Sequence, residues 1–202
     1  KVLVRRLARI GRHSAVTGIP IHPVFAEHTH SRSWSGEKTA IVSSGGIGGG
    51  PLEGAVRALR TTGWKAKVVT GRNEALKHEM ERAFANDQGV AILGLVDHVT
   101  MAGLMQSSHL IVSKPGGLTT FESLASGIPF MVYQPFLIPG QEEGNARFLA
   151  DCGAGVIVRQ ENAIAPTLQA LTDERLAQMS QAALGQALPH AARDIVAHLQ
   201  KL

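Results

Sequence analysis

The chain has 202 residues, of which 44% are hydrophobic and 18% charged, so it can bury the core of one domain and is not typical of a disordered protein. Aromatic residues make up 4%, which argues against stacking on single-stranded nucleic acid, and we expect no nucleic acid partner. The single cysteine, Cys152, excludes an internal disulfide and fits a reducing compartment. No run of about 18 apolar residues predicts a membrane-spanning helix.

The first element is a basic stretch. The net charge is +4, and four arginines lie within the first dozen residues, at Arg5, Arg6, Arg9 and Arg12. Basic and apolar residues alternate there in a helix-like way. The pattern fits a solvated helix face or contact with an anionic membrane surface, where each basic residue contributes on the order of 1 kcal/mol.

Strands and helices then alternate. Residues 17–38 carry two prolines in "TGIPIHPVF" and are expected to form a linker and a loop. Short apolar strands are predicted at 38–44, 64–71, 90–96, 109–113, 129–135 and 154–158. Helices are predicted at 51–63, 73–86, 98–107, 117–127, 142–152 and 161–202, the last broken near 185–189. This order predicts an α/β fold, a Rossmann-like parallel sheet of about six strands with helices on both faces. Ligands of such sheets sit beyond the carboxyl ends of the strands.

A glycine-rich loop, "SSGGIGGGPLEG" (43–54), follows the first strand and opens a helix, where backbone N–H groups form a ready anion site. The G-x-G-x-x-G dinucleotide fingerprint fits poorly, because Pro51 or Glu53 stands where the third glycine belongs. Residues 70–72 also stand where the ribose-binding acid is expected. No G-K-[ST] follows to make a P-loop. NAD binding and a tight turn without a ligand remain alternatives.

The stretch "VSKPGGLTTFESLASGIP" (112–129) follows the fourth strand. Gly116 and Gly117 allow the backbone to approach a ligand, and Thr119 lies in the first helical turn beside free N–H groups. Glu122 lies on the same helix face one turn further on. A carboxylate there suits the diol of a ribose whose diphosphate rests on the helix start. The alternative is a capping box that Glu122 completes.

A third polar cluster, in "PFLIPGQEEGNARFL" (135–149), lies at the entry to the helix after the fifth strand. It contains Gln141, Glu142 and Asn145. Amides and carboxylates together are how proteins hold sugar hydroxyls. The alternative is a group of acids that the helix dipole favours.

The histidines give weaker signals. His28 and His30 lie two apart in a polar loop, and we expect exposure to solvent rather than metal binding. His98 stands beside the loop after the third strand, where nucleotide contact and no contact are both open. His109 precedes a strand and is expected to be structural.

These clusters together resemble the C-terminal domain of GT-B glycosyltransferases. The similar family contains monogalactosyldiacylglycerol synthase, the processive diacylglycerol glucosyltransferases and the peptidoglycan GlcNAc-transferase. The resemblance runs from about residue 17 to residue 171 and is carried by "SGGIGGG", "GLVDHVTM", "KPGGLT" and "PGQEEGNA". The last two look more like the glycolipid branch than the peptidoglycan branch.

The resemblance implies a UDP-sugar site. The diphosphate would lie between two turns, Gly46, Ile47 and Gly48 on one side and Gly117, Leu118 and Thr119 on the other. Uracil would take backbone groups of Leu95 and Val96 and pack on Met101. Glu122 would bind the ribose diol. The hexose would contact Gln141 and Glu142, with Asn145 in support.

The resemblance also implies a division of the chain. Residues 1–16 would be the tail of a mostly absent N-terminal acceptor domain, 17–38 the linker and loop, 39–185 the UDP-sugar-binding domain, and 186–202 a C-terminal helix that crosses back. The catalytic base would lie in the absent domain, so none is named here, and this chain alone would transfer little sugar. The full enzyme would move a hexose to a lipid acceptor with inversion, without a cofactor or a required metal, in the cytoplasm at the membrane surface.

Other functions stay open from the sequence. The chain fits a peptidoglycan-type UDP-GlcNAc transferase, a UDP-GlcNAc 2-epimerase with the same double-Rossmann architecture, or a nucleotide-binding module without catalysis. The transferred sugar and the oligomeric state are not specified by any motif.

Overall fold

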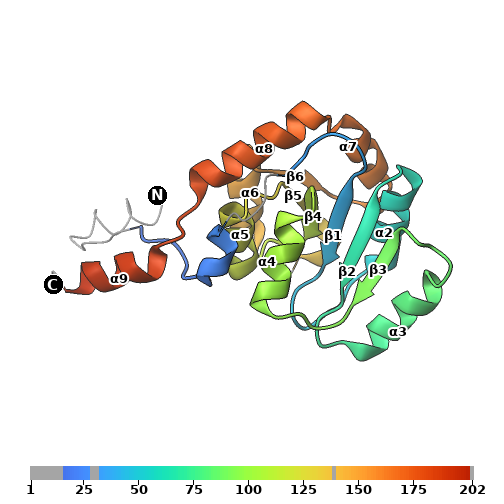
Figure 1. Ribbon diagram of the computed structural model, residues 1–202, viewed down its shortest axis with the longest axis horizontal. Helices are drawn as coiled ribbons and strands as arrows, with labels where there is room; N and C mark the ends of the chain where they lie inside the picture. Colours follow the sequence, from blue (N-terminus) through green and yellow to red (C-terminus); the bar gives the residue numbers. More distant parts are fainter. Residues whose placement is uncertain (1–15, 28–31, 138–139, 201–202) are drawn as a thin grey trace.

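The computed structural model describes residues 16–27, 32–137 and 140–200, which form an α/β structure on one sheet (Figure 1). Six strands lie in the order β3-β2-β1-β4-β5-β6, and every neighbouring pair is parallel. The strands are β1 Thr39–Ser43, β2 Lys65–Val69, β3 Val90–Leu93, β4 Leu110–Ser113, β5 Phe130–Tyr133 and β6 Gly155–Val158. The predicted fold class is confirmed.

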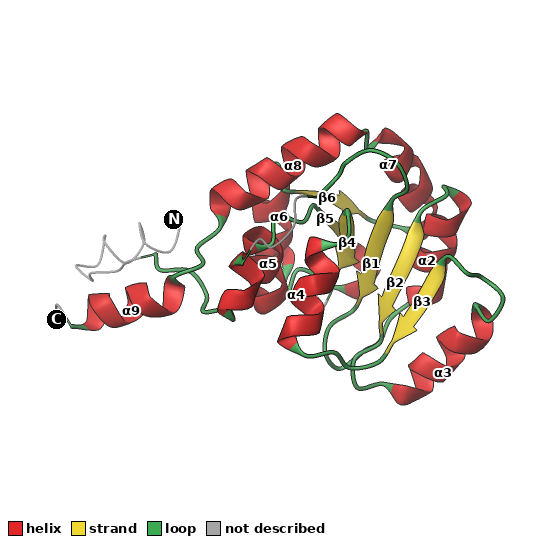
Figure 2. Cartoon of the chain, in the orientation of Figure 1, coloured by secondary structure: helices red, strands yellow, loops and turns green. Residues whose placement is uncertain are grey.

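Helices connect the consecutive strands and cover both faces of the sheet (Figure 2). The α-helices are α2 Leu52–Thr61, α3 Glu74–Ala83, α4 His98–Gln106, α5 Gly117–Ala125, α6 Glu143–Asp151, α7 Ile164–Ala170, α8 Asp173–Gln186 and α9 Ala191–Leu199. In the described residues the short 3-10 turns are η1 Pro23–Ala26, η2 Gln134–Phe136 and η3 Glu161–Ala163. Helix α9 projects away from the sheet at the end where the described chain begins (Figure 1).

The core has two layers because strand side chains alternate between the faces of the sheet. On β1, Ala40 and Val42 face the layer formed with α2, α3 and α7, whereas Ile41 faces the layer formed with α4, α5, α6 and η1. Helix α8 packs against both layers, since Met179 belongs to the first layer and Ala183 to the second.

Several predicted boundaries differ from the structure, among them the end of the helix predicted over 73–86, which is Ala83, and two of the differences have a clear physical cause. The third strand, predicted over 90–96, ends at Leu93, which pairs with Val69, the last residue of β2. The Thr70 N–H makes the last bond, to the Leu93 carbonyl oxygen at 2.9 Å, and the chain then turns away at Gly71, where φ is 63°. The last helical region breaks at Thr172 as well as after α8. The Thr172 hydroxyl accepts the Arg175 N–H at 3.2 Å and caps α8, a start signal that the sequence carried and the prediction missed.

The segment ahead of the sheet is packed onto the domain. Residues 17–25, predicted to be extended linker, run into η1, and its Phe25 is 1% exposed between α4 and α5. The division at residues 16, 38 and 185 stays a prediction. Residues 1–15, with the four arginines, and 28–31, with both loop histidines, lie outside the described residues.

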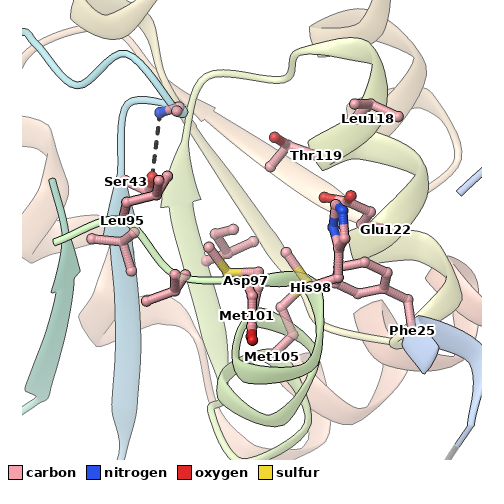
Figure 3. A pocket seen from close by; sticks show the side chains of 15 residues that line it. Phe25, Ser43, Leu95, Asp97, His98, Met101, Met105, Leu118, Thr119 and Glu122 are labelled. Carbon is pink, nitrogen blue, oxygen red and sulfur yellow. Dashed lines mark hydrogen bonds between the residues drawn. The ribbon is translucent and has the colours of Figure 1, made fainter. Parts of the chain in front are cut away.

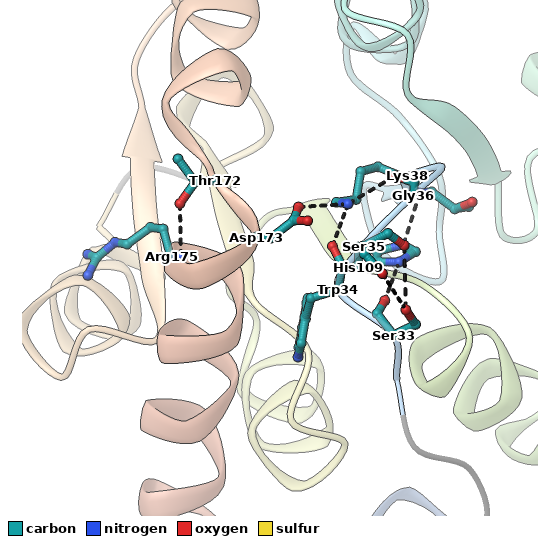
Figure 4. Close-up of polar contacts among 10 residues, drawn as sticks. Ser33, Trp34, Ser35, Gly36, Lys38, His109, Thr172, Asp173 and Arg175 are labelled. Carbon is teal, nitrogen blue, oxygen red and sulfur yellow. Dashed lines mark hydrogen bonds and ion pairs between the residues drawn. The ribbon is translucent and has the colours of Figure 1, made fainter.

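A second set of contacts holds residues 32–39 at the amino end of the sheet (Figure 4). The Nδ1 atom of His109 accepts the Thr39 N–H at 3.1 Å, and its Nε2 lies 2.9 Å from the Ser33 carbonyl oxygen. Lys38 Nζ pairs with Asp173 Oδ1 at 2.8 Å, at the start of α8. His109 therefore has the structural role that was expected of it.

Candidate functional site

A cavity of about 190 Å³ opens at the carboxyl ends of the strands, beside β1 and β4 (Figure 3). The order of the strands reverses between β1 and β4, and open α/β sheets bind ligands at such a point. The structure brings these predicted residues together in the cavity lining: Gly46, Leu95, Val96, Met101, Leu118, Thr119 and Glu122.

The other predicted residues do not line this cavity: Ile47, Gly48, Gly117, Gln141, Glu142 and Asn145. The Ile47 side chain is 88% exposed, and Gly117 directly precedes a lining residue in the first turn of α5. Asn145 Nδ2 donates to the Pro115 carbonyl oxygen at 2.9 Å. The start of α6 is thus attached to the turn that precedes α5.

The glycine-rich loop has two kinds of glycine. Gly48 has a φ of 76°, and a Cβ atom there would lie 1.9 Å from the Thr70 carbonyl oxygen, so this position packs on the end of β2. A Cβ atom on Gly46 or Gly49 would meet no atom within 4 Å. The loop therefore leaves accessible backbone beside the cavity, which is the property that an anion site needs.

Helix α5 starts without a side-chain cap. Its N-cap is Gly116, and among the residues that the structure describes no side chain bonds to the N–H groups of the first turn. Thr119 already lies within the helix, and its carbonyl oxygen accepts the Ser123 hydroxyl at 2.6 Å. The capping-box alternative for Glu122 is therefore wrong, and the first-turn N–H groups remain available to an anion.

Glu122 is partly buried in the cavity wall and receives no hydrogen bond from the residues that the structure describes. Burial raises the pKa of Glu122 above its ordinary value, and the charge of His98 opposes part of that rise. A carboxylate held out of water without a donor is unfavourable, so a ligand that brings two hydroxyl donors would relieve the cost.

A group of rings forms the wall beside Glu122 (Figure 3). His98 and Phe25 line the cavity and meet edge to face, with ring centroids 6.5 Å apart. His98 also stacks on His22 at 5.5 Å with the planes 10° apart. Sequence reasoning missed Phe25 and His22, because the two prolines around them indicated a linker.

The loop after β3 forms the opposite wall. The Asp97 side chain accepts the Thr100 N–H at 2.7 Å and caps α4, which fixes the loop. Leu95 is 60% exposed at the cavity mouth, and Met101 is partly buried below it.

An ion pair lies next to Gly45, one of the residues that line the cavity. Lys114 Nζ is 3.0 Å from Glu142 Oε1, and the two side chains are 22% and 8% exposed. The pair connects the end of β4 to the start of α6. The sequence did not predict it, because no local pattern indicates that these distant residues meet.

The family is shown by direct comparison. The model of the glycosyltransferase family 28 C-terminal domain matches residues 53–199. This chain belongs to that family. The processive diacylglycerol beta-glucosyltransferase of Bacillus subtilis is 31% identical over 183 residues, which cover 84% of this chain and 47% of that protein. The chain spans about half the length of the curated relatives it matches.

Solved structures have the same fold as this family 28 domain. MurG of Acinetobacter baumannii aligns with a TM-score of 0.68 at 19% identity, over 95% of this chain and 56% of that chain. A putative UDP-N-acetylglucosamine 2-epimerase of Listeria monocytogenes aligns with a TM-score of 0.63 at 17% identity, over 92% and 50%.

Within residues 16–27, 32–137 and 140–200, no helix is long and apolar enough to cross a membrane. In the same residues, His, Cys, Asp and Glu side chains do not gather in groups of three or more that could hold a metal ion.

Proposed function

We propose that this chain is the donor-binding half of an enzyme that transfers a hexose from a UDP-sugar to a lipid acceptor with inversion. The observation that carries the proposal is Glu122. This carboxylate lies between the open start of α5 and the loop after β3, and no hydrogen bond from the described residues satisfies it. The names of the family's relatives support diacylglycerol as the acceptor.

The proposed pose follows the cavity. Uracil meets the wall at Leu95 and Val96, with Met101 beneath, and the ribose diol donates to Glu122. The diphosphate lies between two turns: Gly46, Ile47 and Gly48, and Gly117, Leu118 and Thr119. The hexose extends toward the start of α6: Gln141, Glu142 and Asn145.

The proposed reaction is a single displacement. The acceptor hydroxyl oxygen forms a bond to the anomeric carbon as the bond from that carbon to the diphosphate oxygen breaks. A base in the part of the enzyme outside this chain takes the hydroxyl proton, and UDP leaves with the electron pair. The start of α5 stabilises the leaving charge, so we propose no cofactor and no required metal. We place the reaction at the cytoplasmic face of a membrane, with anionic lipid as a partner surface.

Two alternatives use the same donor site. A peptidoglycan-type transferase would prefer UDP-GlcNAc, and a 2-epimerase would convert UDP-GlcNAc without an acceptor. The 2-epimerase also needs catalytic acid and His side chains at the sugar, and His98 lies instead beside the carboxylate proposed for ribose.

Calorimetric titration tests the proposal. The 202-residue chain is titrated with UDP, UDP-glucose, UDP-galactose, UDP-GlcNAc and NAD. We expect binding of UDP and tighter binding of UDP-glucose or UDP-galactose. Preference for UDP-GlcNAc would favour the alternatives, and binding of NAD without UDP would overturn the proposal.

A further inference from the structure

Lys114 lies between the two turns proposed to hold the diphosphate. On one side, a Cβ atom on Gly45 would be 3.2 Å from Cε of Lys114. On the other side, the ammonium group is 3.0 Å from Glu142 Oε1, and that oxygen would be 4.0 Å from a Cβ atom on Gly116. The side chain thus crosses from the end of β4 toward the glycine-rich loop.

The two partners of this ion pair differ in exposure. The Lys114 side chain is 22% exposed, whereas that of Glu142 is 8% exposed. Glu142 lies at the N-cap of α6, and the nearby Asn145 ties that helix to Pro115. The carboxylate is therefore fixed by its surroundings, and the ammonium is the member of the pair that is closer to solvent.

A diphosphate requires positive charge as well as N–H donors. A helix start carries only about half of an elementary charge. An ammonium group offers three donors and a full charge, and charge-assisted hydrogen bonds to phosphate are about twice as strong as neutral ones. Lys114 is placed where such a group would act on the diphosphate.

We propose that Lys114 binds the diphosphate of the donor directly and that Glu142 positions it. This inference rests on the proposed function. Toward the diphosphate, and apart from its proposed contact with the hexose, Glu142 acts through Lys114 by holding the ammonium between the two turns when no donor is bound. In the transfer step, Lys114 would stabilise the charge that develops on the diphosphate oxygen as UDP leaves.

The test is a series of ligands that differ only in phosphate. Uridine, UMP and UDP are titrated into the wild-type chain and into Lys114→Met. The variant should bind UDP roughly tenfold or more weakly, while uridine affinity changes by less than about twofold. Unchanged uridine binding shows that the cavity is intact. Lys114→Arg, which keeps the charge, should retain more of the increase in affinity from uridine to UDP than Lys114→Met does.

Lys67 provides a matched control. It is a partly buried lysine on β2, and its Nζ lies 3.0 Å from the Ser107 hydroxyl, outside the site. Lys67→Met should leave all three affinities unchanged. An equal loss for all three ligands in Lys114→Met, or no loss, would overturn the inference. If wild-type chain binds uridine and gains nothing from phosphate, the inference fails while base recognition stands, and failure to bind any of the three counts against the proposed function itself.

A double-mutant cycle tests the role of Glu142. The quantity compared is the increase in affinity from uridine to UDP. Glu142→Gln should change this increase only while Lys114 is present. In the Lys114→Met background the effect of Glu142→Gln should therefore fall below about twofold. An equal effect in both backgrounds would show that Glu142 acts independently of Lys114.

Discussion

The carboxylate of Glu122 is the single group on which the proposed donor site most depends. It lines the cavity, caps no helix and receives no hydrogen bond from the described residues. The structure therefore separates its contribution to binding from its contribution to folding.

Glu122→Gln should lower UDP affinity by about 2 kcal/mol, roughly thirtyfold, because an amide replaces one charged acceptor of the diol. Stability at neutral pH should not fall, because no described contact is lost and a charge held out of water is removed. Calorimetry and urea unfolding check the two effects. Binding of 2′-deoxy-UDP is the control: it should be weaker than UDP for wild type and nearly equal to UDP for the variant. A large loss of stability with unchanged affinity would contradict the prediction.

The raised pKa of Glu122 predicts opposite pH dependences for folding and for binding. The folded chain holds the proton more tightly than the unfolded chain does. The contribution of Glu122 to the free energy of unfolding is therefore full below the ordinary carboxyl pKa, and it is lost as the pH rises through the raised pKa. UDP affinity needs the charged form, so it should fall as the pH drops through the same window. Unfolding and UDP titration of wild type and Glu122→Gln across pH 4 to 7 check this. If stability and affinity depend on pH in the same way in the wild type and in the variant, the prediction is refuted.

At the scale of elements, different glycines of the glycine-rich loop serve packing and ligand binding. Gly48→Ala should cost at least about 2 kcal/mol of stability, since φ is 76° and the new Cβ atom would overlap the Thr70 carbonyl. Gly46→Ala should fold normally, because its Cβ atom would meet no atom within 4 Å, yet it should weaken UDP binding. Denaturation and calorimetry on the two variants test the contrast. Normal UDP binding by Gly46→Ala would argue against diphosphate at this loop.

The segment before β1 depends on a neutral imidazole. His109 accepts from Thr39 and faces the Ser33 carbonyl, and burial lowers the pKa of His109. The unfolded chain therefore takes up the proton first, and stability should fall as the pH drops below the ordinary histidine pKa toward the lowered one. His109→Ala should cost about 1–3 kcal/mol and remove this dependence. The exposed His78 is the matched control, and equal pH profiles for the two alanine variants would contradict the prediction.

At the scale of the whole molecule, the chain contains the proposed donor site and spans about half of its relatives. We expect the chain alone to bind UDP and to transfer no hexose to diacylglycerol, because the proposed base lies elsewhere. Radiolabelled transfer assays with lipid vesicles, compared with a full-length enzyme, measure this. Turnover by the chain alone would place the base among its own residues.

The sequence predicted what depends on local pattern. Apolar runs such as 110–113 located the strands, and the positions of Gly46, Thr119 and Glu122 after strand ends located the cavity. It did not predict what depends on tertiary contact. Phe25 reaches the cavity only because η1 packs on α4 and α5, and Lys114 meets Glu142 only after α6 docks.

The strand order has a consequence for biosynthesis. Of the six strands in this sheet, β1 is made first but lies inside the sheet, and its second neighbour, β4, ends at Ser113. While the ribosome makes the intervening residues, the apolar edge of β1 has no partner on that side and can pair with another chain. Nascent chains stalled before residue 110 should therefore recruit holding chaperones and aggregate, and chains extended past β5 should not.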